Sequence, residues 1–244
     1  PDNSFQPASL DLRLGDKAYR LRCSFLPDLQ TVEDKLRDYS MGEIDLRDGA
    51  ILERNRPYLI PLMEELHLPQ NIRAKANPRS STGRLDIFTR VITDRSYQFD
   101  EVRPGYRGKL YLEVVSRSFT VKAQTGISLN QLRLIVGESQ CGDDALLTLH
   151  QADPILYDND HAASTERLVG GLFLSVALKS GQPVGFRAKK NSQLLNLTLT
   201  AGHDEEDFWE PVFAERHGRL VLEPEEFYLL LSTESVRIPP RFAA

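Results

Sequence analysis

Short apolar segments separated by polar turns dominate the hydrophobic pattern of this chain. Five segments are alternating or continuously apolar, with Pro, Gly, Asp and Asn between them, namely 9–14, 56–62, 109–115, 172–178 and 226–232. Strands give this pattern, because successive side chains point to opposite faces of a sheet. The pattern predicts a mostly β fold.

Helical spacing is confined to short stretches. Thr31 is a suitable N-cap for a helix over 31–41, in which Val32, Leu36 and Tyr39 fall near helical spacing. The stretch 143–153 also has the composition of a short helix. We therefore expect short helices beside the strands.

The sequence repeats itself at a spacing of 170 residues. Residues 51–74 align with 221–244 without a gap, and seven pairs are identical: Leu52/Leu222, Glu53/Glu223, Tyr58/Tyr228, Leu59/Leu229, Glu64/Glu234, Pro69/Pro239 and Ala74/Ala244. Chance would give roughly one or two. The segments 9–14 and 172–178 are then the matching first strands. The repeat predicts a duplicated β domain.

Asp, Gly, Gln and Ser accumulate in 138–166, where the strand pattern stops. We therefore expect a first domain over 1–137, a linker over 138–166 and a second domain over 167–244. The second copy stops at the position that matches Ala74, which would leave strands without partners. The expectation is a truncated second domain and a chain that is a fragment of a longer protein.

The run "NPRSSTGRLDIF" (77–88) concentrates cations and hydroxyls. Each of Arg79 and Arg84 can donate two hydrogen bonds to phosphate oxygens at once. Ser80 and Ser81 supply hydroxyls, and Gly83 allows the backbone to approach a ligand closely. A helical turn here would add free N–H groups and place Ser80 and Arg84 on one face. Such a run is also typical of a solvated polar turn.

Glu113 is a lone acid in the segment "GYRGKLYLEV" (105–114), among apolar and aromatic neighbours. Strand alternation places it on the side of Tyr111 and Val115. One interpretation is a solvent-facing strand residue. The other is a general base that acts near neutral pH.

Charge and cysteine content exclude several classes of protein. The chain has 30 Lys and Arg against 35 Asp and Glu, a net charge of −5, so no overall positive field draws it to nucleic acid or to an anionic membrane. The sequence contains no run of 18 apolar residues, which is about the length needed to span a bilayer. The two cysteines, Cys23 and Cys141, and the scattered histidines favour a reducing, cytoplasmic setting and argue against zinc.

Four segments in this order, 6–15, 77–88, 105–114 and 126–134, resemble the dCTP deaminase branch of the dUTPase-like superfamily. The resemblance covers about residues 6–136, and the duplication is similar to the longer, two-repeat form of these enzymes. It implies tandem dUTPase-like repeats with a distorted β-barrel or jelly-roll fold, the second incomplete. The implied reaction is hydrolysis of dCTP to dUTP and ammonia without a metal held by the protein.

The resemblance also implies roles for the residues that match its motifs. Glu113 would take a proton from the water that attacks C4 of cytosine and later pass protons to the ring nitrogen and the departing amine. Arg84 would orient Glu113 and stabilise its charge. Ser80 would help to position the water or the base, although a phosphate contact stays open.

The remaining implied residues bind the substrate. Arg79 and Ser81 would hold triphosphate oxygens, with Mg²⁺ bridging the phosphates instead of sitting in a protein cage. Gln131 would line the nucleotide pocket or be an ordinary strand residue, and Asp94 is a further pocket candidate. In relatives the pocket forms between subunits of a trimer, so we expect a homo-oligomer, either a trimer or a pseudo-trimeric arrangement of repeats.

Two other functions stay open. Hydrolytic dUTPases carry an Asp where the stretch "VRPGYRG" has Arg103, which makes dUTP diphosphatase the alternative activity unless Asp100 or Glu101 replaces that acid. A non-catalytic nucleotide-binding or structural module is the other. In either case the second copy has no catalytic constellation and is interpreted as a scaffold.

Overall fold

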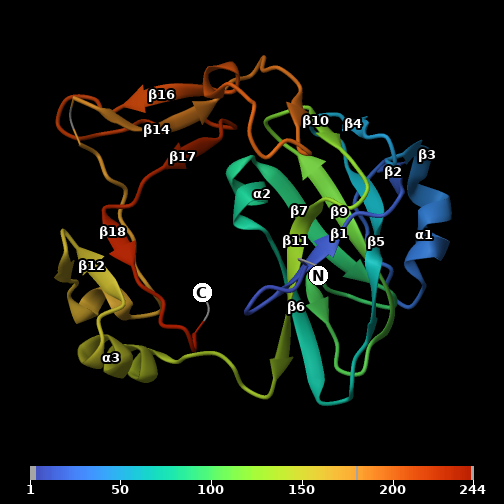
Figure 1. Ribbon diagram of the computed structural model, residues 1–244, viewed down its shortest axis with the longest axis horizontal. Coiled ribbons are helices and arrows are strands. Elements are labelled where there is room, and N and C mark those ends of the chain that lie inside the picture. Colours follow the sequence, from blue (N-terminus) through green and yellow to red (C-terminus); the bar gives the residue numbers. More distant parts are fainter. Residues whose placement is uncertain (1–3, 180, 243–244) are drawn as a thin grey trace. The chain divides into compact units, whose positions relative to one another are not determined.

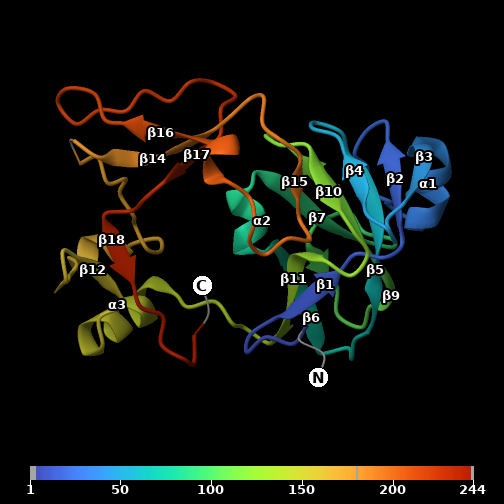
Figure 2. The same ribbon diagram turned by 45° about the horizontal axis from the view of Figure 1, so that its top comes forward.

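The computed structural model describes residues 4–179 and 181–242, and most of its regular structure is β-strand (Figures 1 and 2). The predicted fold class is confirmed at this level. The chain forms two compact units. The first contains the residues up to Glu138 together with Lys189–Phe208, and the second contains Ser139–Ala188 and the residues from Trp209 onward. We call Lys189–Phe208 the arm.

An antiparallel five-stranded sheet, the main sheet, forms half of the first unit. Its strand order is β3 (Ser40–Asp45), β2 (Lys17–Leu21), β5 (Tyr58–His67), β9 (Arg107–Ser116) and β7 (Ile87–Thr93). The predicted strands at 56–62 and 109–115 are thus confirmed. Their alternating apolar residues make one face of the sheet available for a core.

A second sheet packs against the main one. It contains β1 (Leu10–Arg13), β11 (Ser128–Val136), β6 (Ile72–Pro78) and β8 (Glu101–Val102), and its contacts run from β1 to β5 and from β6 and β11 to β7. The side chains between the sheets are at most 1% exposed: Leu12, Leu110, Leu112, Val114 and Leu132. Burial of this apolar surface stabilises the first unit.

The arm contributes a strand to the first unit. A small sheet has the order β15 (Leu195–Asn196), β10 (Val121–Ala123) and β4 (Ala50–Leu52), and β15, which lies in the arm, runs parallel to β10 (Figure 2). The sequence assigns 189–208 to the second domain. The contacts of the arm nevertheless place it with the first unit. The limits of the two domains given by the sequence remain a prediction.

The helices begin where the sequence predicts. α1 spans Val32–Tyr39, and the hydroxyl of its N-cap Thr31 accepts a hydrogen bond from the backbone N–H of Asp34 at 3.1 Å. Val32 and Leu36 are buried and pack with Leu59 of β5. α2 spans Ser80–Arg84 and α3 spans Asp143–Ala152.

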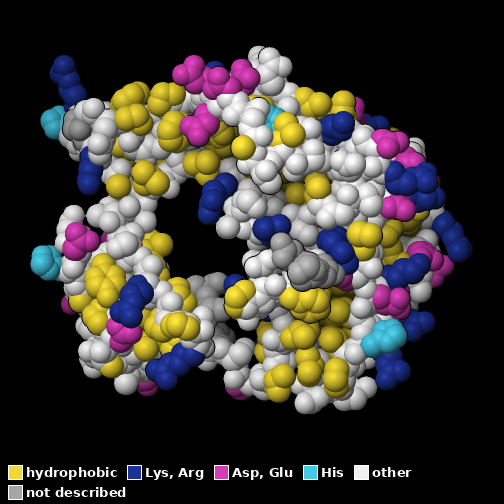
Figure 3. All heavy atoms as spheres, viewed as in Figure 1, with side chains coloured by type: hydrophobic (Ala, Val, Ile, Leu, Met, Phe, Trp, Pro, Cys, Tyr) yellow, Lys and Arg dark blue, Asp and Glu magenta, His cyan; other side chains and the backbone are white. Residues whose placement is uncertain are grey.

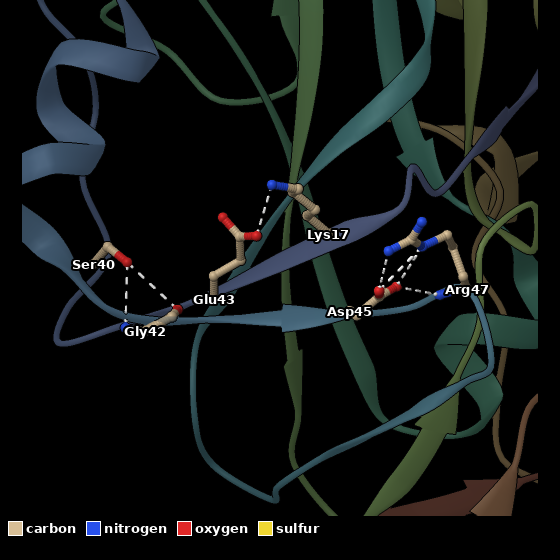
Figure 4. A network of polar contacts seen from close by, with 6 residues as sticks. All are labelled: Lys17, Ser40, Gly42, Glu43, Asp45 and Arg47. Carbon is tan, nitrogen blue, oxygen red and sulfur yellow. Dashed lines mark hydrogen bonds and ion pairs between the residues drawn. The ribbon is translucent and has the colours of Figure 1, made fainter.

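Charged groups line the outer strand β3 (Figure 4). Lys17 pairs with Glu43 at 2.7 Å, and the Arg47 guanidinium contacts the Asp45 carboxylate at 2.5 Å. The backbone N–H of Gly42 donates to the hydroxyl of Ser40 at 3.3 Å. Charges on an edge strand oppose pairing with other chains.

The second unit has two three-stranded sheets. One has the order β16 (Trp209–Phe213), β14 (Pro183–Ala188) and β17 (Tyr228–Leu230), and the other β13 (His161–Ala162), β12 (Leu156–Asp158) and β18 (Glu234–Val236). Short 3-10 turns lie at Thr165–Leu168 and, within the arm, at Glu205–Asp207. Apolar side chains are exposed on and beside the first sheet (Figure 3), with Phe186 41%, Phe213 55% and Leu231 68% exposed.

The strand predicted over 172–178 is wrong, because the structure holds a single bridge there, between Val176 and Ser232. The backbone N–H of Ser175 donates to a carboxylate oxygen of Glu234 at 2.6 Å instead of to a neighbouring strand. The matching segment 9–14 gives the N–H of Arg13 to Glu64 in the same way and still forms β1, because it pairs along β11. In the described chain, no strand pairs along 172–178.

The same local contact occurs in both units at a spacing of 170 residues. The hydroxyl of Tyr58 accepts the backbone N–H of Glu53 at 3.1 Å, and the hydroxyl of Tyr228 accepts that of Glu223 at 3.2 Å. The strand orders β3-β2-β5 and β16-β14-β17 also correspond. One of the identical sequence pairs includes Ala244, which lies outside the described residues.

A second contact also occurs in both units, with its donors 162 residues apart and its acceptors 170 apart. The backbone N–H of Arg13 donates to Glu64 at 2.8 Å, just as that of Ser175 donates to Glu234. The residue after each donor forms an isolated β-bridge. Leu14 bridges to Leu62 in the first unit, and Val176 bridges to Ser232 in the second. The matching segments are those from 9–14 and 172–178.

Candidate functional site

Glu113 lies in the middle of β9 and is 1% exposed. Its register partner on β7 is Arg90, whose Nε and Nη2 donate to Oε1 of Glu113 at 3.1 and 2.5 Å. The other oxygen, Oε2, is buried and has no hydrogen-bond partner in the described part of the chain. The solvent-facing interpretation of Glu113 is therefore wrong, because the side chain is almost completely buried within the chain.

Arg90 is fixed from several sides. Its guanidinium carbon lies 3.7 Å from the ring centre of Phe99 and 5.0 Å from that of Phe88, and Nη2 also donates to the hydroxyl of Ser24 at 2.7 Å. Such stacking favours a planar guanidinium over an ammonium group. The cation is thus held in one orientation beside the acid.

The sequence reasoning missed Arg90 and named Arg84 as the partner of Glu113. Arg84 is exposed and ends α2, whereas the hydrogen bonds that Glu113 accepts in the described chain come from Arg90. A signal existed in "IFTRVIT", where one cation interrupts an alternating strand. Its partner could not be read without the register between β7 and β9.

The segment that was predicted to bind phosphate forms the short helix α2. The backbone N–H of Arg79 donates to the carbonyl of Leu129 at 3.1 Å, and its guanidinium lies 3.3 Å from the buried carboxylate of Asp11. Thr82 is 2% exposed and anchors the helix. The anchoring leaves Ser80 and Ser81 at the surface.

Ser80, Ser81 and Arg84 are all exposed on α2. Their donors and the permanent charge of Arg84 therefore meet solvent, where an anion could reach them. Asp11 offsets part of the charge of Arg79. Arg84 is the stronger attraction for an anion on this segment.

Gln131 and Asp94 have local partners. Gln131 is half-buried on β11, and its side-chain oxygen accepts a hydrogen bond from Ser9 at 3.0 Å. The Asp94 carboxylate accepts the backbone N–H of Val32 at 2.7 Å, which satisfies one of the free donors at the start of α1. This contact gives Asp94 a structural task, whether or not it also lines a pocket.

Asn130, which the sequence reasoning passed over, is completely buried beside Gln131. Its side-chain nitrogen donates to Thr89 on β7 at 3.1 Å, and its side-chain oxygen is buried without a partner in the described chain. The bond shows that Thr89 faces the second sheet. Arg90, the next residue, therefore faces the opposite side of the main sheet.

The predicted residues fall into two groups. α2 and Gln131 are close together, because α2 contacts β11 and β7. Glu113 and Arg90 point to the face of the main sheet that α1 covers, on the side of Leu59. Within one chain, the acid and the serine segment thus lie on different faces.

Asp100 and Arg103 occupy the region that bears on the alternative activity. The Asp100 carboxylate accepts the backbone N–H of Val91 at 2.8 Å, and burial raises its pKa above the ordinary value. Arg103 is exposed and donates to the carbonyl of Arg95 at 3.0 Å. A guanidinium cannot serve as the proton acceptor at this position.

Among residues 4–179 and 181–242, no three His, Cys, Asp or Glu side chains are grouped so that they could hold a metal ion. The expectation of Mg²⁺ on the triphosphate stays a prediction. Within the same ranges, no helix combines the length and apolar character needed to cross a membrane.

The sequence matches two family models over nearly its whole length. Residues 1–138 match the N-terminal domain, and residues 142–244 the C-terminal domain, of 2'-deoxycytidine 5'-triphosphate deaminase. The fold is similar to the crystal structure of 2'-deoxycytidine 5'-triphosphate deaminase from Agrobacterium tumefaciens. The TM-score is 0.90 and the identity 43%, over 98% of this chain and 71% of that one.

Curated relatives match the first half of the chain. A dCTP deaminase of Halorubrum lacusprofundi is 31% identical over 135 residues, 54% of this chain and 63% of that protein. One of Haloarcula marismortui is 32% identical over 136 residues, 54% of this chain and 66% of that protein. A dUMP-forming dCTP deaminase of Methanothermobacter thermautotrophicus is 26% identical over 115 residues, 47% of this chain and 55% of that protein. The chain thus spans less than two thirds of each of these relatives.

Proposed function

Because this chain belongs to the 2'-deoxycytidine 5'-triphosphate deaminase family, we propose that it hydrolyses dCTP to dUTP and ammonia, with Glu113 as the general base. The observation that carries the proposal is the buried Glu113 carboxylate, of which one oxygen binds Arg90 and the other has no partner in the described chain. A base needs an oxygen that can accept a proton. Oε2 meets that need.

The reaction consumes one water and releases one ammonia. Glu113 takes a proton from the water as the oxygen attacks C4 of cytosine and passes it to the ring nitrogen. It then takes the second proton from the new C4 hydroxyl and passes it to the amine, which leaves as ammonia when the C4–N bond breaks. The fixed guanidinium of Arg90 keeps the carboxylate in place through these transfers. The new carbonyl at C4 makes the product dUTP.

α2 supplies the groups for the triphosphate. The exposed Arg84 and the hydroxyls of Ser80 and Ser81 bind phosphate oxygens, with Arg79 at the edge and Mg²⁺ carried by the nucleotide. Gln131 lies beside α2 and lines the nucleotide pocket. Asp94, which follows β7 and accepts the first backbone N–H of α1, is a further residue of the nucleotide pocket.

The site is completed by assembly. Since Glu113 and α2 lie on different faces of one chain, a nucleotide that meets both needs a second copy of the chain, in a trimer, or a second repeat in a pseudo-trimer. Mixing two inactive variants tests this arrangement. If Glu113→Gln and Arg84→Ala chains are refolded together, shared sites regain part of the activity. Mixed chains without activity would contradict a shared site.

The second unit is a partial copy of the dUTPase-like fold and acts as a scaffold. Besides the paired tyrosine and glutamate contacts, Arg20 lies 3.0 Å from Glu53, and Arg187 lies 3.4 Å from Glu223. In both units the arginine is the register partner of the tyrosine on the next strand. This repetition favours tandem repeats with distorted-barrel architecture.

The exposed thiols Cys23 and Cys141 are free cysteines. Free exposed thiols are typical of a reducing compartment, which supports a cytoplasmic site of action. The alternative activity, dUTP diphosphatase, is disfavoured because Arg103 replaces the acid that such hydrolysis needs.

An ammonia-release assay on the chain tests the proposed function. With dCTP, the chain should release ammonia and form dUTP, and Glu113→Gln should lower the rate by at least about 10²-fold while leaving the Kd for dCTP within about twofold. Glu43→Gln, the same change on an exposed strand residue, is the matched control. If the chain releases pyrophosphate from dUTP and no ammonia from dCTP, its activity is dUTP diphosphatase and not deamination. If it binds either nucleotide without turnover, it is a nucleotide-binding module.

A further inference from the structure

Asp86, two residues beyond the end of α2, has a left-handed backbone conformation. Its φ is 53°, in the left-handed region that favours glycine. Its backbone N–H donates to Gly83 at 3.1 Å, its carbonyl accepts the backbone N–H of Arg117 at 2.9 Å, and its carboxylate accepts the hydroxyl of Ser118 at 2.7 Å. The end of α2 thus depends on the loop after β9.

That loop is held by the arm. Phe119 is completely buried, and its ring meets Phe208 of the arm edge to face at 5.6 Å between ring centres. The backbone N–H of Leu195 in the arm donates to the carbonyl of Thr120 at 3.1 Å. Strand β15 then continues this pairing along β10.

Arg54 joins the loop and the arm through one nitrogen. Its Nη1 donates to the carbonyl of Lys190 in the arm at 3.0 Å and to that of Ser118 at 3.4 Å. Arg54 is exposed, so its removal leaves no cavity. A continuous chain of contacts therefore runs from the arm through Ser118 and Asp86 to α2.

The arm covers the first unit instead of its own sheet. The arm connects β14 to β16. In the first unit, the corresponding connection, between β2 and β3, contains α1. α1 covers the main sheet of its own unit through Val32 and Leu36, whereas Phe186 in the sheet of the second unit is 41% exposed. The corresponding segments thus pack on different partners.

We propose that the arm is a positioning element for triphosphate binding. Through Phe119, Ser118 and Asp86 it fixes the C-terminal end of α2 and thereby the direction of Arg84. The proposal rests on the proposed function of α2 as the triphosphate segment. The proposal gives the second sequence repeat, which contains the arm, an effect on the affinity for nucleotide. No residue of the arm touches the substrate.

The test uses Ser118→Ala and Arg54→Ala in the full chain, with Arg56→Ala as the control for loss of an exposed arginine. The first two variants should each raise the KM and the Kd for dCTP about three- to tenfold, with kcat within about twofold of the unaltered chain. Ser118→Ala removes the hydrogen bond to Asp86, and Arg54→Ala removes the two that join the loop to the arm. Arg56→Ala should change neither constant. In an Asp86→Gly background, Ser118→Ala should add no further rise, because its acceptor is already gone.

Unchanged KM in both variants, or a loss of kcat at unchanged KM, would overturn the positioning role while leaving deamination intact. If the unaltered chain releases no ammonia from dCTP, the proposed function fails, and the Kd for dCTP measured by calorimetry then decides. A Kd that is unchanged by Ser118→Ala and Arg54→Ala, or no binding at all, would also overturn the positioning role. A rise in both would sustain it.

Discussion

Arg90 donates two hydrogen bonds to one oxygen of Glu113, from Nε at 3.1 Å and from Nη2 at 2.5 Å, while the other oxygen is buried without a partner in the described chain. The two residues are register partners on β7 and β9. A strand pair therefore sets the position of the Glu113 carboxylate, and the guanidinium stacked on Phe99 sets its orientation.

Replacing Arg90 by methionine should leave a buried carboxylate without its cation. We expect a loss of about 3 to 5 kcal/mol in the free energy of unfolding. In the ammonia-release assay, kcat should fall at least about 10²-fold, because the acid loses the cation that holds its orientation. Arg84→Gln should raise KM and leave kcat within about twofold. A loss of kcat with Arg84→Gln and not with Arg90→Met would restore Arg84 as the partner of Glu113.

The two matching tyrosines should differ in their contribution to stability. Tyr58 is 1% exposed, so Tyr58→Phe leaves the backbone N–H of Glu53 without its acceptor in a buried place, at about 1 to 2 kcal/mol. Tyr228 is half-buried, and water can replace its hydroxyl, so Tyr228→Phe should cost less than about 0.5 kcal/mol. Urea unfolding of both variants measures the difference. Equal losses would show that burial does not control this contact.

Asp94→Ala should separate a capping role from a pocket role. Its carboxylate accepts the backbone N–H of Val32, so the substitution should cost about 1 kcal/mol of stability and loosen the start of α1. Thermal unfolding and the KM for dCTP are the two measurements. A KM that rises more than about tenfold would place Asp94 in the nucleotide pocket, and an unchanged KM would leave it as a cap.

Asp100→Asn should stabilise the chain at neutral pH. Burial raises the pKa of Asp100, so its protonated form favours folding. That contribution is complete below the unfolded pKa and is lost as the pH rises through the folded one. Asparagine keeps an acceptor for the N–H of Val91 without a charge. The melting temperature should exceed that of the unaltered chain at pH 7, and the difference should shrink toward pH 4.

Asp45→Asn is the control of opposite sign for Asp100. Hydrogen bonds from Arg47 lower the pKa of Asp45 to about 2, so its charged form favours folding. Its asparagine variant should lower the melting temperature at pH 7, and the loss should fade as the pH falls toward that value. If Asp100→Asn also lowered the melting temperature at pH 7, burial would not be the dominant influence on Asp100.

Local features of the sequence were sufficient for much of the fold. The apolar alternation in 56–62 and 109–115 marks β5 and β9, and Thr31 marks the start of α1, because strand faces and helix caps depend on residues near in sequence. The helical turn of α2 follows from the same kind of local signal. The strand predicted over 172–178 failed because a strand also needs a partner. The matching segment 9–14 pairs with β11, whereas in the described chain 172–178 has only the bridge from Val176 to Ser232.

The sequence by itself determined that Glu113 lies on a strand, and it left 80–84 open between a helical turn and a solvated polar turn. Only the tertiary structure decided that Arg90 meets Glu113 and that the arm braces the loop beside α2. These contacts join residues far apart in the chain, and they depend on strand register and on the packing of whole elements. Local periodicity carries no information about either.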